Sequence, residues 1–367
     1  MKDHEALGVE ALGQVFQQPW RCQRLDHQAQ LQAVAQQPPD HLGVLVESVE
    51  VEHTDGGTET IGDPTHSVVA PGAFGNKSVL QAEDYLRIAQ SLDDNRSGTL
   101  LERAAHCSDR HTPVERQADD LAAILYTSGT TGRSKGAMLT HGNLLSNAVT
   151  LRSYWGWRTP KQGGDVLVHA LPIFHVHGLF VAIHGALING SPMLWLSKFD
   201  PKKALAWFSR ATVFMGVPTL YVRLLAEPGL TPEAVKSMRL FISGSAPLLI
   251  ETFKAWQERT GHTILERYGM SETIMLTSNP YSADKRYKGQ DERRGGTVGF
   301  PLPGVSLRVQ GDDGKDLPVG EIGGIQVKGP NVFKGYWRMP EKTAEEFTAD
   351  GWFKTGDVGK VDERDYV

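Results

Sequence analysis

From Asp119 onward, the hydrophobic positions of this chain fall into short apolar blocks separated by stretches with helical periodicity. Blocks of this length, bounded by Gly, Pro or polar residues, predict buried strands at residues 121–126, 166–171, 211–217 and 239–243. Helices are predicted from Thr140 as N-cap to residue 151, at 202–209 and at 218–226. Strands that alternate with helices predict an α/β layered fold with a largely parallel sheet.

The pattern changes after Gly295. Residues 305–309 and 322–327 predict short strands, and Asp312-Asp313-Gly314 between them predicts a tight turn. This texture is typical of a small antiparallel β-subdomain. We therefore expect an α/β core over residues 94–294 and a small β-subdomain over residues 295–367.

The apolar positions of residues 1–93 show little sustained helical or strand periodicity. Nine Gln residues fall between positions 14 and 37, and residues 47–75 are rich in Gly, Thr, His and acidic side chains. Two interpretations stay open for this atypical segment. It is either an unusual folded subdomain, or a segment that is poorly ordered or not the expected product of its gene.

Composition excludes several classes of protein. The net charge of −5 over 367 residues gives no field that would attract nucleic acid or anionic lipid. Cys22 and Cys107 are the two cysteines, with no spacing that predicts a metal site or a disulfide framework. No signal peptide is evident at the start, and no apolar run reaches the ~18 residues of a membrane span. We expect a cytoplasmic protein without a membrane span or nucleic-acid partner; the sequence does not predict an oligomeric state.

The segment 127–136 carries the strongest chemical signal. Its glycines let a backbone approach phosphate closely, its hydroxyls can donate to phosphate oxygens, and its lysine supplies a compact positive charge. It is not a Walker A loop, because Gly136 rather than Ser or Thr follows the lysine. The candidate phosphate-binding residues are Thr127, Ser128, Gly129, Thr130, Thr131, Gly132 and Lys135.

This loop resembles the phosphate-binding signature of the adenylate-forming superfamily, which includes acyl-CoA synthetases, nonribosomal-peptide adenylation domains and luciferases. Three further segments resemble that superfamily in the expected order: Gly244-Ser245-Ala246-Pro247, Tyr268-Gly269-Met270-Ser271-Glu272-Thr273 and Lys354-Thr355-Gly356-Asp357. The resemblance implies that ATP binds along these segments. It also implies that Tyr268 stacks on adenine, Asp357 accepts hydrogen bonds from the ribose hydroxyls, and Glu272 holds Mg²⁺.

Two regions bear on the acid that is activated. The segment 171–179 matches the superfamily segment beside the acyl pocket, and the resemblance implies that His175 is a gate toward the pantetheine tunnel; His177 and His184 could equally be core histidines. Segments 279–281, 299–305 and 329–337 resemble malonyl-CoA synthetases, whose malonate pocket uses arginine. The resemblance implies that Arg223, with Arg293 or Arg294, binds the distal carboxylate, whereas a surface basic pair at 293–294 is the other interpretation.

These features predict an ATP-dependent ligase of the kind used in fatty acid metabolism. It would activate malonate, methylmalonate or a similar short dicarboxylate as an acyl-adenylate and transfer it to CoA, with Lys135, His175 and Glu272 as the catalytic candidates. Alternatives are a nucleotide-binding remnant without turnover, another short-chain acyl-CoA synthetase, or an adenylation domain that feeds a carrier protein. Superfamily members continue past the position of Val367 into a hinge and a mobile domain with a catalytic lysine, so we expect this chain alone to be feebly active at most.

Overall fold

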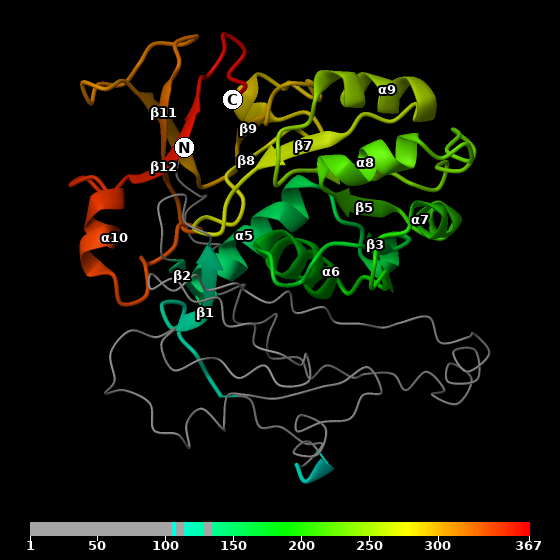
Figure 1. Cartoon of the computed structure of the whole chain (residues 1–367), viewed down its shortest axis with the longest axis horizontal. Helices are drawn as coiled ribbons and strands as arrows, with labels where there is room; N and C mark the ends of the chain where they lie inside the picture. The colour runs from blue at the N-terminus through cyan, green and yellow to red at the C-terminus, as the bar shows by residue number, and fades with distance from the viewer. Residues whose placement is uncertain (1–104, 108–113, 128–133) are drawn as a thin grey trace, which may run out of the picture. The chain divides into compact units, whose positions relative to one another are not determined.

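The computed structural model describes residues 105–107, 114–127 and 134–367 (Figure 1). The chain divides into two compact units, Met1–Asp109 and Arg110–Val367. The predicted atypical segment 1–93 lies outside the described residues. The architecture that follows is that of the second unit.

A seven-stranded sheet with the order β4-β3-β5-β6-β7-β8-β9 forms the centre of this unit. The strands β4, β3, β5, β6 and β7 are mutually parallel where they pair, and β8 and β9 add to the edge in antiparallel fashion. Their bounds are β3 Leu167–His169, β4 Met193–Trp195, β5 Val213–Gly216, β6 Leu240–Ser243, β7 Leu265–Tyr268, β8 Thr277–Ser278 and β9 Phe300–Pro301. The predicted α/β fold with a largely parallel sheet is therefore confirmed.

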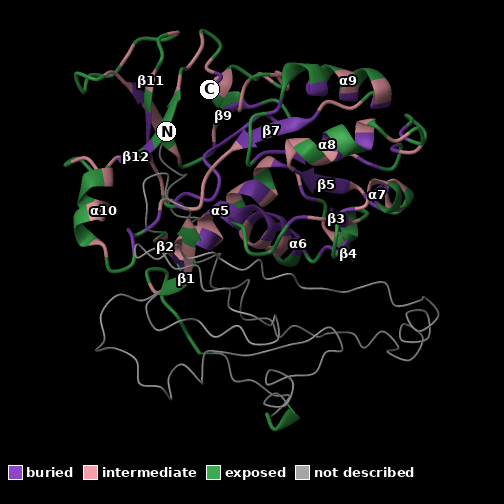
Figure 2. Cartoon of the chain, in the orientation of Figure 1, coloured by how far each residue is buried: buried purple, intermediate pink, exposed green. Residues whose placement is uncertain are grey.

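Helices cover both faces of the sheet (Figure 1). Successive side chains of a strand point to opposite faces. Accordingly, Val213 and Met215 of β5 join the core beneath α5 and α6, whereas Phe214 joins the core beneath α7, α8 and α9. Figure 2 shows the buried residues along these strands. The helical elements are α5 His141–Tyr154, a π-helix His177–Ile183, α6 His184–Asn189, α7 Pro201–Phe208, α8 Pro218–Leu225 and α9 Ile250–Thr260, with 3₁₀ turns at Pro160–Gln162 and Lys285–Tyr287.

A hairpin of β1 (Leu121–Thr127) and β2 (Lys135–Thr140) leads into α5. The predicted strand at 121–126 is confirmed, but its predicted burial is wrong, since Leu121 is 42% and Tyr126 57% exposed. Within the described residues β1 pairs with β2 alone, which leaves much of its surface uncovered. The predicted N-cap at Thr140 is confirmed. Its hydroxyl accepts a hydrogen bond from the Asn143 backbone amide at 3.1 Å, and the Asn143 side-chain oxygen accepts one from the Thr140 backbone amide.

The small β-subdomain is a three-stranded antiparallel sheet with the order β10-β11-β12, as predicted. Its strands are β10 Ser306–Gln310, β11 Gly323–Lys328 and β12 Phe353–Gly359, and the helix α10 Pro340–Glu346 precedes β12. The predicted turn after β10 closes at Gly314, whose φ of +76° suits a residue without a Cβ. Phe333, Phe347 and Phe353 stack against one another and join this subdomain to its helix.

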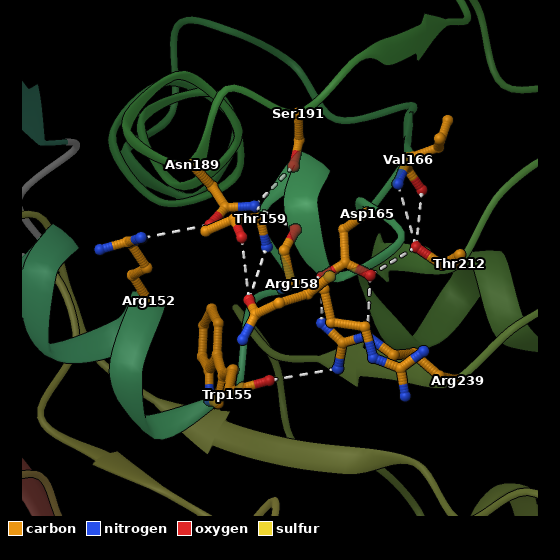
Figure 3. Close-up of polar contacts among 11 residues, drawn as sticks. Arg152, Trp155, Arg158, Thr159, Asp165, Val166, Asn189, Ser191, Thr212 and Arg239 are labelled. Atoms are coloured by element: carbon orange, nitrogen blue, oxygen red, sulfur yellow. Dashed lines mark hydrogen bonds and ion pairs between the residues drawn. The ribbon is translucent and has the colours of Figure 1, made fainter.

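A buried polar network fixes the amino ends of three neighbouring strands (Figure 3). Asp165, Thr212 and Arg239 lie just before β3, β5 and β6. Arg239 donates from Nε and Nη2 to the two carboxylate oxygens of Asp165 at 2.8 and 2.5 Å, and Thr212 adds a hydrogen bond of 2.7 Å. Burial alone would raise the pKa of Asp165, but these donors hold it below its usual range. The network is structural. It lies at the amino ends of the strands, and their carboxyl ends lie on the opposite side of the sheet.

Candidate nucleotide and acyl site

Two of the predicted nucleotide segments follow adjacent parallel strands. Gly244 comes directly after β6, and Gly269 comes directly after β7. The two strands pair through Ile242 with Leu265 and Ser243 with Glu266, so the segments that follow them emerge together. Ligands in open α/β sheets bind outside the carboxyl ends of the strands. The region at the carboxyl ends of β6 and β7 is therefore the candidate site.

The segment after β7 turns too tightly for any residue but glycine at its first position. A Cβ on Gly269 would lie 2.0 Å from the carbonyl oxygen of Ile274, which real structures do not tolerate. The turn places Tyr268 before it and Glu272 within it. Thr273, also in the predicted motif, is fully buried and its carbonyl accepts a hydrogen bond from the Asn331 side chain at 2.7 Å. Thr273 therefore supports this turn from beneath.

Tyr268 and Asp357 are brought together from the two sheets. The Tyr268 hydroxyl donates a hydrogen bond to the Asp357 carboxylate, although 89 residues separate them in the chain. Burial raises the pKa of Tyr268, and its bond to Asp357 raises it further, so the phenol stays protonated and remains a donor. Asp357 is exposed on β12. The predicted adenine and ribose residues thus lie within hydrogen-bond reach of each other.

Glu272 is buried beneath the small β-subdomain. Its Oε1 atom accepts a hydrogen bond of 3.0 Å from the Tyr336 hydroxyl, and its carbonyl accepts one of 2.8 Å from the Phe333 amide. Burial raises the pKa of Glu272, while the Tyr336 bond and the positive charge of Lys135 oppose that rise. A carboxylate with raised pKa gains from a nearby cation. Mg²⁺ in nucleotide sites usually binds one or two protein carboxylates, and Glu272 can serve as such a ligand.

Lys135 begins β2 and faces both Tyr336 and α10. Its Nζ atom lies 4.7 Å from the centre of the Tyr336 ring and 3.6 Å from Oε1 of Glu346. Thr127, at the other end of the loop, donates weakly to the Lys135 carbonyl at 3.4 Å. The residues Ser128, Gly129, Thr130, Thr131 and Gly132 lie outside the described residues. Lys135 and Glu272 thus both contact Tyr336, Lys135 over the ring and Glu272 at the hydroxyl.

The loop after β6 is shaped by a side chain that the sequence patterns did not single out. A Cβ on Gly244 would lie 2.5 Å from the guanidinium of Arg267. The next residue, Ser245, has a φ of +69°, which is unusual for a residue other than glycine. Its hydroxyl lies 3.1 Å from Nδ1 of His177. Ala246 follows as an exposed residue.

Arg267 is 2% exposed, and its Nε and Nη2 atoms have no hydrogen-bond partner in the part of the chain that the structure describes. No carboxylate in that part forms an ion pair with it. Burial lowers the pKa of Arg267 to about 9, and its charge adds to the burial that lowers the pKa of His177. Buried charges are normally paired. A buried guanidinium without a partner among the described residues, near the carboxyl end of β7, can pair with an anionic ligand.

The two histidines of the predicted acyl segment differ in position. His175 is exposed and its ring packs 4.6 Å from that of Phe174. His177 is 2% exposed and begins the π-helix, and its Nε2 has no hydrogen-bond partner among the described residues. The gate role of His175 stays a prediction. His177 reaches the Ser245 hydroxyl, and both interpretations of this buried histidine stay open.

Of the three predicted carboxylate-binding arginines, Arg293 and Arg294 line one cavity, whereas Arg223 contacts Phe199. Arg223 donates to the Phe199 carbonyl at 3.3 Å and lies over the Phe199 ring. Arg293 donates to the carbonyls of Thr263 and Pro280 and lines a cavity of about 710 Å³. Thr263 precedes β7, so Arg293 lies near the amino end of that strand. A four-residue strand spans about 13 Å, which separates Arg293 from the segment that follows β7.

Arg294 has a different partner again. It donates to Asp362 at 2.5 Å and lies over the ring of Tyr366, so it holds the segment near Val367 in place. The grouping of Arg223 with Arg293 or Arg294 around one substrate carboxylate stays a prediction. Each of these arginines already contacts protein carbonyls or a carboxylate, whereas Arg267 does not. No pattern in the sequence marks Arg267, because it lies in a strand beside a second charged residue.

In the described residues, no group of three or more His, Cys, Asp or Glu side chains could hold a metal ion. Among the same residues, no helix is both long and apolar enough to cross a bilayer. A site with Glu272 as a sole carboxylate remains compatible with Mg²⁺, whose other ligands are commonly waters and phosphates.

The fold and these motifs define a class. The family model of the AMP-binding enzymes matches residues 35–337, and the chain belongs to that family. A malonate–CoA ligase of Arabidopsis thaliana is 40% identical over 268 residues, which cover 68% of this chain and 42% of that protein. The malonate–CoA ligase ACSF3 of Homo sapiens is 37% identical and covers 65% of this chain and 46% of the human protein.

Solved structures agree with the fold. The crystal structure of MatB from Rhodopseudomonas palustris is 59% identical with a TM-score of 0.70, covering 76% of this chain and 53% of that one. A malonyl-CoA ligase in a ternary product complex with methylmalonyl-CoA and AMP is 40% identical with a TM-score of 0.62, covering 69% and 53%. The chain thus spans about half the length of the proteins it matches.

Proposed function

We propose that this chain forms the nucleotide- and acyl-binding part of an ATP-dependent acid–thiol ligase whose acid is malonate or a similar short dicarboxylate. Membership of the AMP-binding enzyme family and the malonate–CoA ligase names of its relatives support the class of reaction. The observation that carries the choice of acid is the buried, unpaired guanidinium of Arg267 beside Gly244.

Arg267 suits a dicarboxylate for a simple electrostatic reason. A buried guanidinium without a counter-charge is costly, and a planar carboxylate can accept two of its parallel N–H donors. The distal carboxylate of malonate supplies that partner, while a monocarboxylate of similar size would leave the charge unpaired. The hydroxyl of Ser245 and the imidazole of His177, which touch each other, lie beside this position and offer further polar contacts.

The nucleotide would lie along the same strand edge. The aromatic face of Tyr268 would stack on adenine, and Asp357 would exchange its bond from Tyr268 for bonds from the ribose hydroxyls. Lys135 would offset charge on the phosphates as a compact cation. Mg²⁺, bound through Glu272 and phosphate oxygens, would neutralise further negative charge when present.

The proposed reaction has two steps. A carboxylate oxygen of the acid attacks the α-phosphorus of ATP, the bond to the bridging oxygen breaks, and pyrophosphate leaves with that electron pair. The thiol of CoA then loses its proton and attacks the acyl carbon, and AMP leaves. Both reactants of the first step are anions, so positioning and charge neutralisation by Arg267 and Lys135 are the contributions that this part of the protein can make.

Two measurements on the purified chain test the proposal. Calorimetric titration with ATP should show binding, and malonate-dependent release of pyrophosphate should exceed that with butyrate. ATP binding without any pyrophosphate release would instead favour a nucleotide-binding part that does not turn over alone. Failure to bind ATP would contradict the proposal.

A further inference from the structure

The phosphate-loop lysine already has a protein counter-charge. Oε1 of Glu346, the last residue of α10, lies 3.6 Å from Nζ of Lys135, and both side chains are 21% exposed. Oε1 of the same Glu346 also lies 3.1 Å from Nζ of Lys342. One carboxylate is thus shared between a lysine of the small β-subdomain and the lysine of the phosphate loop.

The Lys135 ammonium has an ion-pair partner but no hydrogen bond among the described residues. No acceptor among the described residues lies within hydrogen-bond distance of its Nζ, and its other contact is the face of Tyr336 at 4.7 Å. Within the described residues, the charged partner of Lys135 is therefore Glu346, at ion-pair rather than hydrogen-bond distance. The Tyr336 hydroxyl is in turn bonded to Glu272, so the ring between the two charged groups is fixed.

We propose that Glu346 is a positioning residue that occupies Lys135 in the absence of nucleotide and is exchanged for a phosphate oxygen when nucleotide binds. This inference rests on the nucleotide site of the proposed function. Its physical basis is competition: a carboxylate and a phosphate are alternative partners for one ammonium. The exchange would also loosen the tie between α10 and β2, which couples the position of the small β-subdomain to phosphate occupancy.

The sign of the effect follows from the charges. Glu346→Gln keeps the size of the side chain, removes one negative charge beside the phosphate position, and releases Lys135. ATP and inorganic pyrophosphate should therefore bind about two- to five-fold more tightly, as suits loss of one partly exposed ion pair. Adenosine, which has no phosphate, should bind as it does to the parent.

A matched control lies one residue away. Glu345 is on the same helix and pairs with the same Lys342 at 3.0 Å, but it has no ion pair with Lys135. Glu345→Gln removes the same charge and should leave ATP affinity close to that of the parent. In a Lys135→Met background, the gain from Glu346→Gln should largely disappear, because the lysine that the change releases is gone.

The experiment is calorimetric titration of parent and variants with ATP, pyrophosphate and adenosine, beside thermal melting to confirm that each variant is folded. Tighter ATP and pyrophosphate binding for Glu346→Gln alone supports the inference. Unchanged or weaker binding, an equal gain for Glu345→Gln, or an undiminished gain in the Lys135→Met background would overturn it. A parent that binds no ATP would overturn the proposed function instead, so the two failures are distinguishable.

Discussion

The guanidinium of Arg267 occupies the space that a side chain at residue 244 would need. A Cβ on Gly244 would lie 2.5 Å from both Cζ and Nη1 of Arg267. Arg267 itself is 2% exposed. A side chain at residue 244 therefore requires either the guanidinium of Arg267 or the loop after β6 to move.

Gly244→Ala should displace Arg267 and weaken the acid site more than the nucleotide site. The guanidinium must move by several tenths of an ångström or the loop must lift, and overpacking of this kind costs about 1–3 kcal/mol. We expect lower thermal stability and loss of malonate preference in a comparison with butyrate. Gly229→Ala is a control for loss of a glycine, since Gly229 has no positive φ and a Cβ there would meet only Leu205 Cδ1 at 3.9 Å.

Arg267→Met should have opposite effects on stability and on acid selection. Replacing a buried, unpaired charge by an apolar side chain of similar length removes its desolvation cost, so the melting temperature should hold or rise. Malonate preference should fall about ten- to a hundred-fold, the range for hydrogen bonds to a charged group. A large fall in melting temperature would show that Arg267 has a structural role instead.

Arg223→Leu is the informative companion to that variant. Arg223 is held by the Phe199 carbonyl and ring, and it is exposed on α8. If Arg267 selects the acid, Arg223→Leu should keep most of the malonate preference. Loss of preference in Arg223→Leu with retention in Arg267→Met would reverse the assignment.

Acid should destabilise the protein through His169. This side chain is 1% exposed at the end of β3, and burial lowers its pKa from 6.5 to about 4. In the unfolded chain it binds a proton below pH 6.5, whereas in the folded chain it does not until about pH 4. Stability should therefore fall as the pH drops from 6.5 toward 4, by on the order of 2 kcal/mol for this group.

His169→Phe tests that expectation by difference. Phenylalanine keeps an aromatic ring against Trp195, whose ring centre lies 4.3 Å from that of His169. Urea unfolding of parent and variant at pH 7 and pH 5 should show that the free energy of unfolding falls less between these pH values for the variant. An equal loss in both proteins would assign the acid sensitivity to other groups, such as His177 and His184, whose pKa values burial also lowers.

Lys135→Ala should weaken ATP binding and any adenylation that the chain supports. Loss of one preorganised charge at a site of phosphate chemistry typically costs ~10²–10³-fold in rate. Lys236 forms an exposed ion pair with Glu233 and has no ion pair with a residue of this site, so Lys236→Ala makes a charge-matched comparison. If both variants bind ATP like the parent, the loop assignment fails.

Much of the fold follows from the apolar blocks. The strands β5 and β6 are buried along their whole length and contain no charged residue, so hydrophobicity alone marks them. The strand β7 is also buried, yet it reads Leu265-Glu266-Arg267-Tyr268, and its two charged residues conceal it from any hydrophobic pattern. One of the strands that the pattern missed is therefore the one that carries the candidate acid-binding residue.

The nucleotide motifs were predictable because they are contiguous in sequence. Tyr268 and Glu272 belong to one short segment, and burial raises the pKa of each. The partners that complete the site come from far along the chain, as with Tyr336 on Glu272 and Glu346 on Lys135. Such pairs depend on the packing of the small β-subdomain, which local periodicity does not encode.

The most direct test of the central claim is equilibrium binding of two unreactive acyl-adenylate analogues, joined through a sulfamoyl linkage, that differ only in the distal carboxylate. One carries a malonyl group and the other a butyryl group, so binding is measured without any need for turnover. The parent chain should bind the malonyl analogue at least about ten-fold more tightly, and Arg267→Met should abolish that preference. Equal affinity of the parent for both analogues would contradict the account.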